Sequence, residues 1–397
     1  MKNYSNNIDI KFSGRDIICV SSMPYNGMWT RKQRLMTILA EMGNRVLYVE
    51  PVEPLLGSSG NTGSLRTSFQ KARENLYILT PAGRLPLARI SPILKMNFNR
   101  YVKVIRKTAL KLKFENPILF TYTPVIHAHS PFIDICRYFK ESPLIYDCVD
   151  EHSETIGYVP GAADIVHQLD LELTRKADLV FVTAKGLYED RKTLNNNIHF
   201  SPNGVDVGHF SKALLPETKL PDDIKAIPEP RIGFMGALSK WIDLELIEKI
   251  ARYFKNCSIV IIGPAEPDPR IDQLKQMGNV YFLGKKRLEE LPGYLKAFKC
   301  GINPFRRIGI SEKVNPLKVY EYLAAGLPVI STDMPEIMRL KGVVYLAQND
   351  EQFINAVEQA VNNELRPDSL MLNKILSEHN WDTIFSRVVK EMSKILD

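Results

Sequence analysis

The chain has 397 residues, of which 45% are hydrophobic and 24% charged, and its formal net charge is +7. This length and apolar content are sufficient for two domains of ordinary size, each with its own core. No run approaches the roughly 18 apolar residues of a membrane span. The modest positive charge suits anionic partners.

Sequence features at the start of the chain and at its cysteines indicate a cytoplasmic protein. The first sixteen residues are polar, and the apolar run that follows, Ile17–Val20, is too short for a signal peptide. The five cysteines are scattered, contain no CxxC pair and lie mostly in apolar runs. They are typical of reduced core residues.

The N-terminal half alternates short apolar runs with helical segments. Strands are predicted at 16–20, 45–49, 118–122, 144–147 and 179–182, and a helix at 29–42. This order indicates a parallel βαβ sheet. Gly27, in the loop after the first strand, permits close approach of a ligand. A plain turn is the alternative explanation for this glycine. Arg31 and Gln33 at the helix start are candidate ligand contacts, and ordinary exposed polar residues of a helix are the alternative for them.

Two further loops of this half carry polar side chains of interest. Asp147 and Asp150 follow the strand at 144–147, at the edge where open α/β sheets bind ligands. A buried acid that accepts loop N–H groups is the alternative for Asp147. His127 and His129 have no carboxylate or cysteine partner, so we predict no metal site. Residues 51–75, rich in Gly, Ser and Asn, predict a mobile loop.

The segment from Lys95 to Lys113 predicts a basic amphipathic helix. It contains seven basic residues and no acid, and apolar residues recur on its opposite face at helical spacing. Such a helix suits peripheral contact with an anionic membrane. A solvated basic face without a partner is the alternative.

The segment Ser201–Phe210, SPNGVDVGHF, predicts a domain boundary because Pro, Asn and Gly interrupt regular structure. We predict an N-terminal domain over 1–205, a C-terminal domain over 206–375, and a terminal helix over 376–397. The second domain repeats the strand and helix alternation, with strands near 232–235, 258–263, 279–284 and 329–332 and a helix at 244–253. Gly236 after its first strand permits close approach of a diphosphate.

The segment Asn315–Thr332, NPLKVYEYLAAGLPVIST, predicts a short helix followed by a strand. Asn315 is expected as N-cap, Pro316 as the first helical residue and Gly326 as the C-terminal stop. Cations crowd the helix start, where acids are the usual residues. This favours a bound phosphate or diphosphate. Lys318 and Glu321 are three residues apart and therefore share a helix face. With a phosphate at Lys318, the carboxylate of Glu321 lies about one turn further and could accept hydrogen bonds from ribose hydroxyls. An ordinary surface Lys/Glu pair is the alternative.

These motifs resemble the donor-binding signature PxKxxEYLAxGxPV and the PNGVDxxxF hinge of glycosyltransferase family 4, or group 1, of the GT-B fold. The resemblance implies an α/β protein with two Rossmann-like, doubly wound domains facing across a cleft, and a C-terminal helix that crosses back onto the first domain. It also implies that Glu321 holds the donor ribose. Lys313 stands where many members have a glutamate, and Ala237 and Ile242 where many have phosphate-binding cations.

By this resemblance each candidate residue receives a role. Asp150 is the first candidate for an acidic catalytic residue and Asp147 the second, while Gly27, Arg31 and Gln33 lie on the acceptor side. The expected donor-binding residues are Gly236, Lys240, Gly284, Lys285, Arg306, Lys313, Lys318 and Glu321.

The expected function is transfer of a sugar from a nucleotide-diphosphate sugar, with UDP as the nucleotide, to a cell-wall or surface polysaccharide or lipid-linked acceptor. The family implies retention of configuration without metal or cofactor. A nucleotide-sugar epimerase of the same fold and a non-catalytic nucleotide-sugar-binding partner are the alternatives. Nucleic acid is not an expected partner, because the basic residues lack aromatic interleaving and known motifs.

Overall fold

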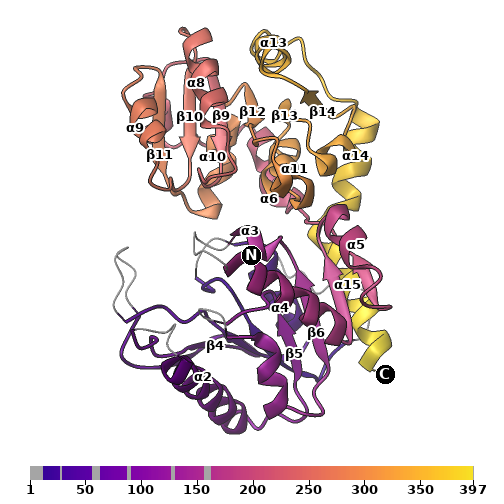
Figure 1. Cartoon of the computed structure of the whole chain (residues 1–397). Coiled ribbons are helices and arrows are strands. Elements are labelled where there is room, and N and C mark those ends of the chain that lie inside the picture. The colour runs from indigo at the N-terminus through magenta and orange to yellow at the C-terminus, as the bar shows by residue number, and fades with distance from the viewer. Residues whose placement is uncertain are drawn as a thin grey trace. The chain divides into compact units, whose positions relative to one another are not determined.

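The computed structural model describes residues 12–26, 29–55, 63–86, 91–126, 130–155 and 162–396 (Figure 1). The chain divides into two compact units. The N-terminal unit comprises Met1–Ser201 together with Phe385–Asp397, and the C-terminal unit comprises Pro202–Ile384. Each unit is built on one sheet with helices packed against it, which confirms the predicted α/β class.

The described residues of the N-terminal unit form an eight-stranded sheet of order β3-β4-β2-β1-β5-β6-β7-β8. All its neighbouring strands are parallel except the β3–β4 pair. The strands are β1 (Asp16–Val20), β2 (Arg45–Val49), β3 (Ser68–Arg73), β4 (Leu76–Thr80), β5 (Ile118–Thr121), β6 (Leu144–Cys148), β7 (Leu179–Val182) and β8 (Ile198–Phe200). The helices are α1 (Arg31–Glu41), α2 (Ser91–Lys111), η2 (Phe132–Tyr138), α3 (His152–Thr155), α4 (Ala162–Lys176) and α5 (Lys185–Arg191).

The central strands of this sheet are apolar because both faces are covered. Every residue of β1, β5, β6 and β7 is buried, as expected for parallel strands between helical layers. The strands predicted at 16–20, 45–49 and 179–182 have these same bounds in the structure. Those at 118–122 and 144–147 differ by one residue.

The prediction of a loop over 51–75 is wrong for its last part. Residues 68–73 form β3, an edge strand that pairs antiparallel with β4. Phe69 stacks on Tyr77 with ring centroids 5.9 Å apart, while most other β3 side chains face water. A mainly polar strand gives little apolar signal, because pairing with β4 satisfies its backbone. Residues 56–62 lie outside the described residues.

The C-terminal unit contains a parallel sheet of order β11-β10-β9-β12-β13-β14 in its described residues. Its strands are β9 (Arg231–Met235), β10 (Ser258–Ile262), β11 (Val280–Gly284), β12 (Cys300–Asn303), β13 (Val329–Thr332) and β14 (Val344–Ala347). Its larger helices are α8 (Leu244–Tyr253), α9 (Pro269–Lys275), α10 (Leu291–Lys296), α11 (Leu317–Ala324), α13 (Asp350–Val361) and α14 (Ser369–Glu378). The short ones are α6 (Val207–Phe210), η3 (Ser211–Leu214), α7 (Asp222–Lys225), η4 (Leu288–Glu290), η5 (Gly309–Lys313) and α12 (Pro335–Met338).

The last helix, α15 (Trp381–Leu396), begins in the C-terminal unit, and from Phe385 onward it belongs to the N-terminal unit. Its apolar side chains Ile384, Phe385, Val388, Val389 and Met392 are almost completely buried. No helix in the described part of the chain combines the length and the apolar character needed to cross a membrane.

Two glycines let side chains lie flat against the middle of the C-terminal sheet. A Cβ added to Gly233 of β9 would lie 2.0 Å from Phe298, and one added to Gly301 of β12 would lie 2.5 Å from Tyr322. These distances are far below van der Waals contact. The aromatic rings therefore occupy the space that a side chain at 233 or 301 would need.

We predict that Gly233→Ala destabilises the protein by about 1–3 kcal/mol, because the added methyl group overpacks the core at Phe298. Gly278→Ala is the matched control. A Cβ at Gly278 meets nothing within 4 Å, so its effect should stay within about 0.5 kcal/mol. Urea unfolding of the two variants measures the difference, and equal stabilities would contradict the packing described here.

Candidate active site

Three glycines gather at the carboxyl edge of the C-terminal sheet, at the ends of β9, β10 and β11. Gly236, Gly263 and Gly284 have φ of +144°, +137° and +67°. The amide of Gly236 donates to Ile262 O at 2.8 Å, and that of Gly263 donates to Gly284 O at 2.9 Å. A Cβ on Gly263 would lie 2.1 Å from Gly236 O. This edge is therefore bare backbone that a ligand can approach closely.

The helix α11 begins beside this edge, one residue later than predicted. Asn315 was expected as the N-cap, but Pro316 occupies that position and the helix starts at Leu317. The side chain of Asn315 is buried, and its amide donates to Tyr320 OH at 3.3 Å and to Glu336 Oε2 at 3.2 Å. Its side-chain oxygen accepts no hydrogen bond among the described residues, so Asn315 does not cap the helix. The first turn of α11 has no acidic residue, so its partial positive charge has no carboxylate within that turn.

Lys318, in the first turn of α11, reaches over the end of β9. Its Nζ lies 4.3 Å from the ring centroid of Phe234 and 5.2 Å from that of Phe305. A Cβ on Gly236 would lie only 2.9 Å from the same Nζ. The ammonium group is thus held by two aromatic faces against the backbone of Gly236. The structure brings together two residues, Gly236 and Lys318, that are far apart in sequence.

The surroundings of Lys318 make its charge sensitive to a bound anion. Burial lowers the pKa of Lys318 to about 7, and the carboxylate of Glu321 acts in the opposite direction. Glu321 is only partly exposed and lies one turn further along α11. A diphosphate next to Nζ would supply the negative charge that favours the protonated amine.

Two hydrogen bonds fix α11 in place. The amide of Met235 donates to Tyr322 OH at 2.6 Å, which ties the helix to the end of β9. The side chain of Asn203 donates to Asn315 O at 2.9 Å. A Cβ on the neighbouring Gly204 would lie 2.8 Å from His379 O. The PNG sequence at 202–204 therefore supports the start of α11, a role that its turn-forming character alone does not indicate.

The other predicted donor-binding residues lie on loops of the same unit. Arg306 follows β12, and its backbone amide donates to Trp241 O at 2.8 Å, which joins this loop to the one after β9. Lys240 and Lys285 are exposed on the loops after β9 and β11, and Lys313 ends η5. Arg307, next to Arg306, pairs with Asp333 at 2.7 Å.

In the N-terminal unit, two predicted site residues pair with each other. Arg31 Nε lies 2.7 Å from Asp147 Oδ2, and Arg31 Nη2 donates to Ser201 Oγ at 2.9 Å. The side chains of Arg31 and Asp147 are 2% and 0% exposed. Gln33 is also buried, accepts from Thr30 N at 3.1 Å and donates to Pro24 O at 2.9 Å. These contacts hold the start of α1. Gly27 lies outside the described residues.

Lys32, the residue between Arg31 and Gln33, is also buried. Lys32 Nζ donates to Ser22 Oγ at 2.7 Å and lies 5.8 Å from the ring centroid of Tyr122. Burial lowers the pKa of Lys32, which Asp150 and Asp147 oppose. Burial also raises the pKa of Asp150, which Lys32 and His152 oppose. Lys32 and Asp150 thus influence each other's charge, and Asp150 follows β6 at the carboxyl edge of this sheet.

Sequence reasoning missed several residues of these two edges. Lys32 looked like one more polar residue of an amphipathic helix, and only the neighbouring Asp150 sets it apart. Phe234 and Phe305 looked like ordinary strand and loop residues until the fold placed Lys318 over them. Ser239 is buried, and its hydroxyl has no hydrogen-bond partner among the described residues. Ser239 lies in the loop after β9, so we add it to the candidate ligand-binding residues.

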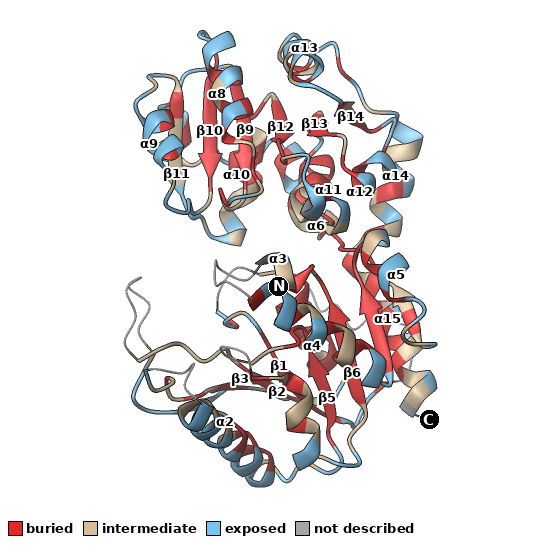
Figure 2. Ribbon diagram, viewed as in Figure 1, coloured by how far each residue is buried: buried red, intermediate tan, exposed pale blue. Residues whose placement is uncertain are grey.

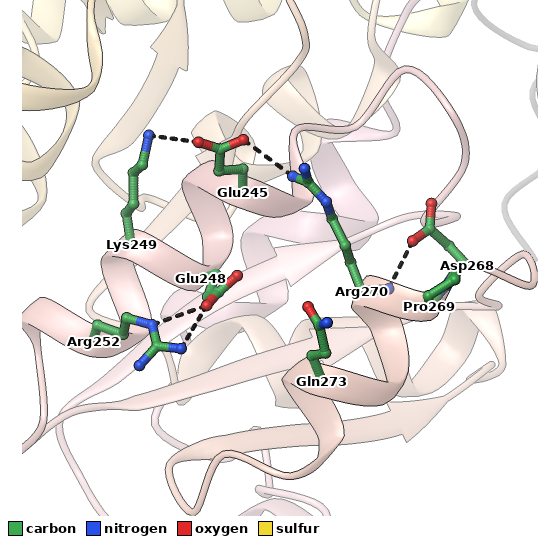
Figure 3. A pocket seen from close by; sticks show the side chains of 8 residues that line it. All are labelled: Glu245, Glu248, Lys249, Arg252, Asp268, Pro269, Arg270 and Gln273. Atoms are coloured by element: carbon green, nitrogen blue, oxygen red, sulfur yellow. Dashed lines mark hydrogen bonds and ion pairs between the residues drawn. The ribbon is translucent and has the colours of Figure 1, made fainter.

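A cavity of about 780 Å³ lies elsewhere in the C-terminal unit, between α8 and α9 (Figure 3). Its charged walls are paired among themselves: Glu245 with Lys249 and Arg270, and Glu248 with Arg252. Asp268 accepts from the backbone amide of Arg270 at 2.8 Å. With most of its charges paired, the cavity is a solvated surface hollow and a poor candidate for the donor site. No group of three or more His, Cys, Asp or Glu side chains is arranged for a metal ion within the described residues.

The first prediction for the site concerns the pH dependence of stability. The pKa of Lys318 is about 7 in the folded protein against an ordinary value of 10.5. Between these two values the unfolded chain binds more protons, so the free energy of unfolding should rise with pH in this window. Lys318→Met should remove that rise and should be more stable than wild type at pH 6.5. Urea unfolding from pH 6 to 10 measures both.

Lys341→Met is the control for this experiment, because Lys341 is an exposed lysine of the same unit. It should keep the wild-type dependence on pH. Wild type and Lys318→Met with the same slope would show that the amine of Lys318 is not desolvated.

The second prediction separates structure from function at Arg31. Arg31→Met leaves the carboxyl group of Asp147 buried without its partner and should cost about 3 kcal/mol of stability. The double variant Arg31→Met/Asp147→Leu removes both charges and should recover most of that loss. Denaturant unfolding of the variants measures the coupling. A single variant as stable as wild type would mean that the pair is not structural.

Comparisons with known proteins agree with this geometry. Residues 229–363 match the family model for glycosyl transferases group 1. The teichuronic acid biosynthesis glycosyltransferase TuaH of Bacillus subtilis (strain 168) is 26% identical over 322 residues, which cover 74% of this chain and 78% of TuaH. The matched family region contains Gly236, Lys318 and Glu321.

Solved structures share the fold over nearly the whole chain. Sucrose-phosphate synthase from Thermosynechococcus elongatus superimposes with a TM-score of 0.70 at 14% identity, covering 96% of this chain and 99% of that one. Anabaena Alr3699/HepE in complex with UDP-glucose gives 0.64 at 14% identity, covering 95% and 99%. The two-unit architecture is therefore the GT-B fold, with a Rossmann-like sheet in each unit.

Proposed function

We propose that this protein is a group 1 glycosyltransferase of GT-B fold. In this proposal it transfers a sugar from a UDP-sugar to a cell-wall or surface polysaccharide acceptor. The C-terminal domain, 206–375, binds the donor, and the N-terminal domain, 1–205, presents the acceptor, with the terminal segment 376–397 packing on the N-terminal domain. In the reaction the bond between the anomeric carbon and the diphosphate breaks and a bond to an acceptor oxygen forms. UDP leaves, and the acceptor hydroxyl loses its proton.

The observation that carries this proposal is the position of Lys318. Its ammonium group lies against Gly236 at the start of α11, where backbone N–H groups and the helix dipole also attract anions. A diphosphate bound here gains negative charge as the sugar leaves. Stabilising that charge is the main electrostatic demand of the transfer.

The remaining donor contacts follow from the same placement. Glu321, one turn beyond Lys318, suits the ribose hydroxyls of the nucleotide, as in the family it resembles. Gly284 leaves the end of β11 open for the base, which backbone groups would hold. Lys240, Lys285, Arg306 and Lys313 complete the donor-binding set, in place of the cations and the glutamate that many family members have.

On the acceptor side we assign the reaction centre to Asp150, with Lys32 as its neighbour. Burial raises the pKa of Asp150, which favours its protonated form more than in water and suits a carboxyl group that exchanges a proton with the acceptor. Asp147 is the second candidate and orients Arg31 at the start of α1. We also assign Gly27 and Gln33 to the acceptor side. We further propose that configuration is retained and that no metal takes part.

The names of the relatives support a proposal for the donor and the acceptor. TuaH is named for teichuronic acid biosynthesis, and HepE was solved with UDP-glucose. We propose a UDP-sugar donor, an acidic and lipid-linked acceptor such as that of teichuronic acid synthesis, and a cytoplasmic protein at the inner face of the cell membrane. The net charge of +7 suits an acidic polymer.

The test is a thermal-shift panel of nucleoside diphosphates and their sugars, because a ligand of the native state raises apparent stability. UDP and UDP-sugars at about 100 times Kd should stabilise by about 2.7 kcal/mol. Lys318→Ala and Glu321→Ala should lose most of this shift, while Lys341→Ala keeps it. No response to any nucleoside diphosphate would refute the donor site.

An assay of sugar transfer distinguishes the three candidate functions: transferase, epimerase and non-catalytic binding partner. A transferase releases UDP faster when an acceptor is added, and release should vanish in Lys318→Ala and Glu321→Ala. An epimerase of the same fold would convert the donor alone into an isomer, which chromatography detects. A non-catalytic binding partner would show the thermal shift without release of UDP under any condition.

A further inference from the structure

The helix α2 of the N-terminal unit carries a charged face that the donor chemistry does not use. From Ser91 to Lys111 it has no acidic residue. Its exposed cations include Arg100, Lys103, Lys107 and Lys111, here called the basic stripe. Figure 2 shows this outer face of α2 exposed along its length, while its inner face is buried.

Two large apolar side chains lie within the basic stripe. Met96 is 44% exposed and Leu110 is 73% exposed. Steps of three and four residues place Met96, Arg100, Lys103, Lys107 and Leu110 along one side of the helix. Two exposed apolar side chains thus flank the row of cations on one face of α2. Cations flanked by exposed apolar residues are what an interfacial helix presents to lipid.

A small groove opens beside the basic stripe. It has a volume of about 160 Å³ and is lined in part by Arg84, Arg100 and Lys103, and no carboxylate lines it in the described residues. The side chain of Asn97 holds the Arg84 segment against α2, since it accepts from Leu85 N at 3.0 Å and donates to Leu85 O at 3.4 Å. The three cations thus come from two segments fixed relative to each other, and they line part of a groove that is large enough for a phosphate group.

We propose that α2 docks the protein on an anionic lipid bilayer, with the basic stripe on the headgroups, Met96 and Leu110 in the interface and a lipid phosphate in the groove. This inference deepens the proposed function, on which it rests for the lipid-linked acceptor. Charge complementarity identifies the occupant, because each Lys or Arg near an anionic surface contributes about 1 kcal/mol of attraction. Nucleic acid is disfavoured, since a phosphate backbone offers nothing to Met96 and Leu110.

The test is sedimentation of the full chain with vesicles of phosphatidylglycerol and phosphatidylcholine, and with vesicles of phosphatidylcholine alone. Binding should occur only with the anionic vesicles and should fall with added salt. Arg100→Glu/Lys103→Glu/Lys107→Glu should weaken it by at least about tenfold. Met96→Ser/Leu110→Ser should weaken it most at high salt, where the apolar contribution remains.

Lys212→Glu/Lys255→Glu/Lys341→Glu is the matched control: it reverses three exposed lysines of the C-terminal unit, so the net charge changes equally, and binding should persist. The thermal shift with UDP should be the same in all three variants, which shows that they fold and keeps this test separate from the donor site. Wild type that stays in solution, equal loss in the control, or binding to duplex DNA or RNA in place of vesicles would overturn the proposal.

Discussion

The partly buried ammonium group of Lys318 is the charge around which the carboxyl edge of the C-terminal sheet is arranged. Holding a cation away from water is unfavourable, and the low pKa of about 7 expresses that cost. The ring faces of Phe234 and Phe305 offset part of it. The amine also requires that position 236 has no side chain. Such an arrangement is unfavourable in the free protein and becomes favourable when an anion binds, which is what a donor-phosphate site needs.

The elements around Lys318 act as its support. Tyr322, on the buried side of α11, receives a hydrogen bond from the end of β9 and lies flat on Gly301 of β12. Asn203 holds the carbonyl group of Asn315 just before the helix. Strand, helix and hinge sequence therefore fix one another. Each contact joins α11 to a different part of the unit. The amine of Lys318 is therefore positioned by the sheet and the hinge sequence as well as by its own helix.

In the N-terminal unit, buried charged side chains pair with one another and connect several elements. Arg191 pairs with Asp170 at 2.7 Å and with Glu151 at 3.3 Å, and Tyr146 donates to Asp170 at 2.8 Å. These contacts join β6, α4 and α5 to the loop that carries Asp150. A buried ion pair adds little net stability, but it fixes geometry, since loss of either partner leaves a charge in the core. The network therefore holds the candidate catalytic loop in one conformation.

The sequence by itself determined the α/β class, most of the parallel strands, the helix and strand of residues 315–332 and the concentration of cations there, because apolar periodicity, glycine and proline are local signals. It also singled out α2, whose charge and spacing are visible in 21 residues. It misassigned Asn315 as an N-cap, because its side-chain partner Glu336 comes from another helix. It also treated the polar edge strand β3 as loop.

Only the tertiary structure decided which way the charged side chains face. Arg31 and Asp147 are 116 residues apart, so their pairing leaves no trace in the local sequence pattern. The pairing holds the Arg31 side chain in the interior of the N-terminal unit. Likewise, nothing near Lys318 in sequence shows that two aromatic rings lie beneath it. Burial and pairing of charge depend on long-range contacts, whereas the formation of strands and helices depends mainly on neighbours along the chain.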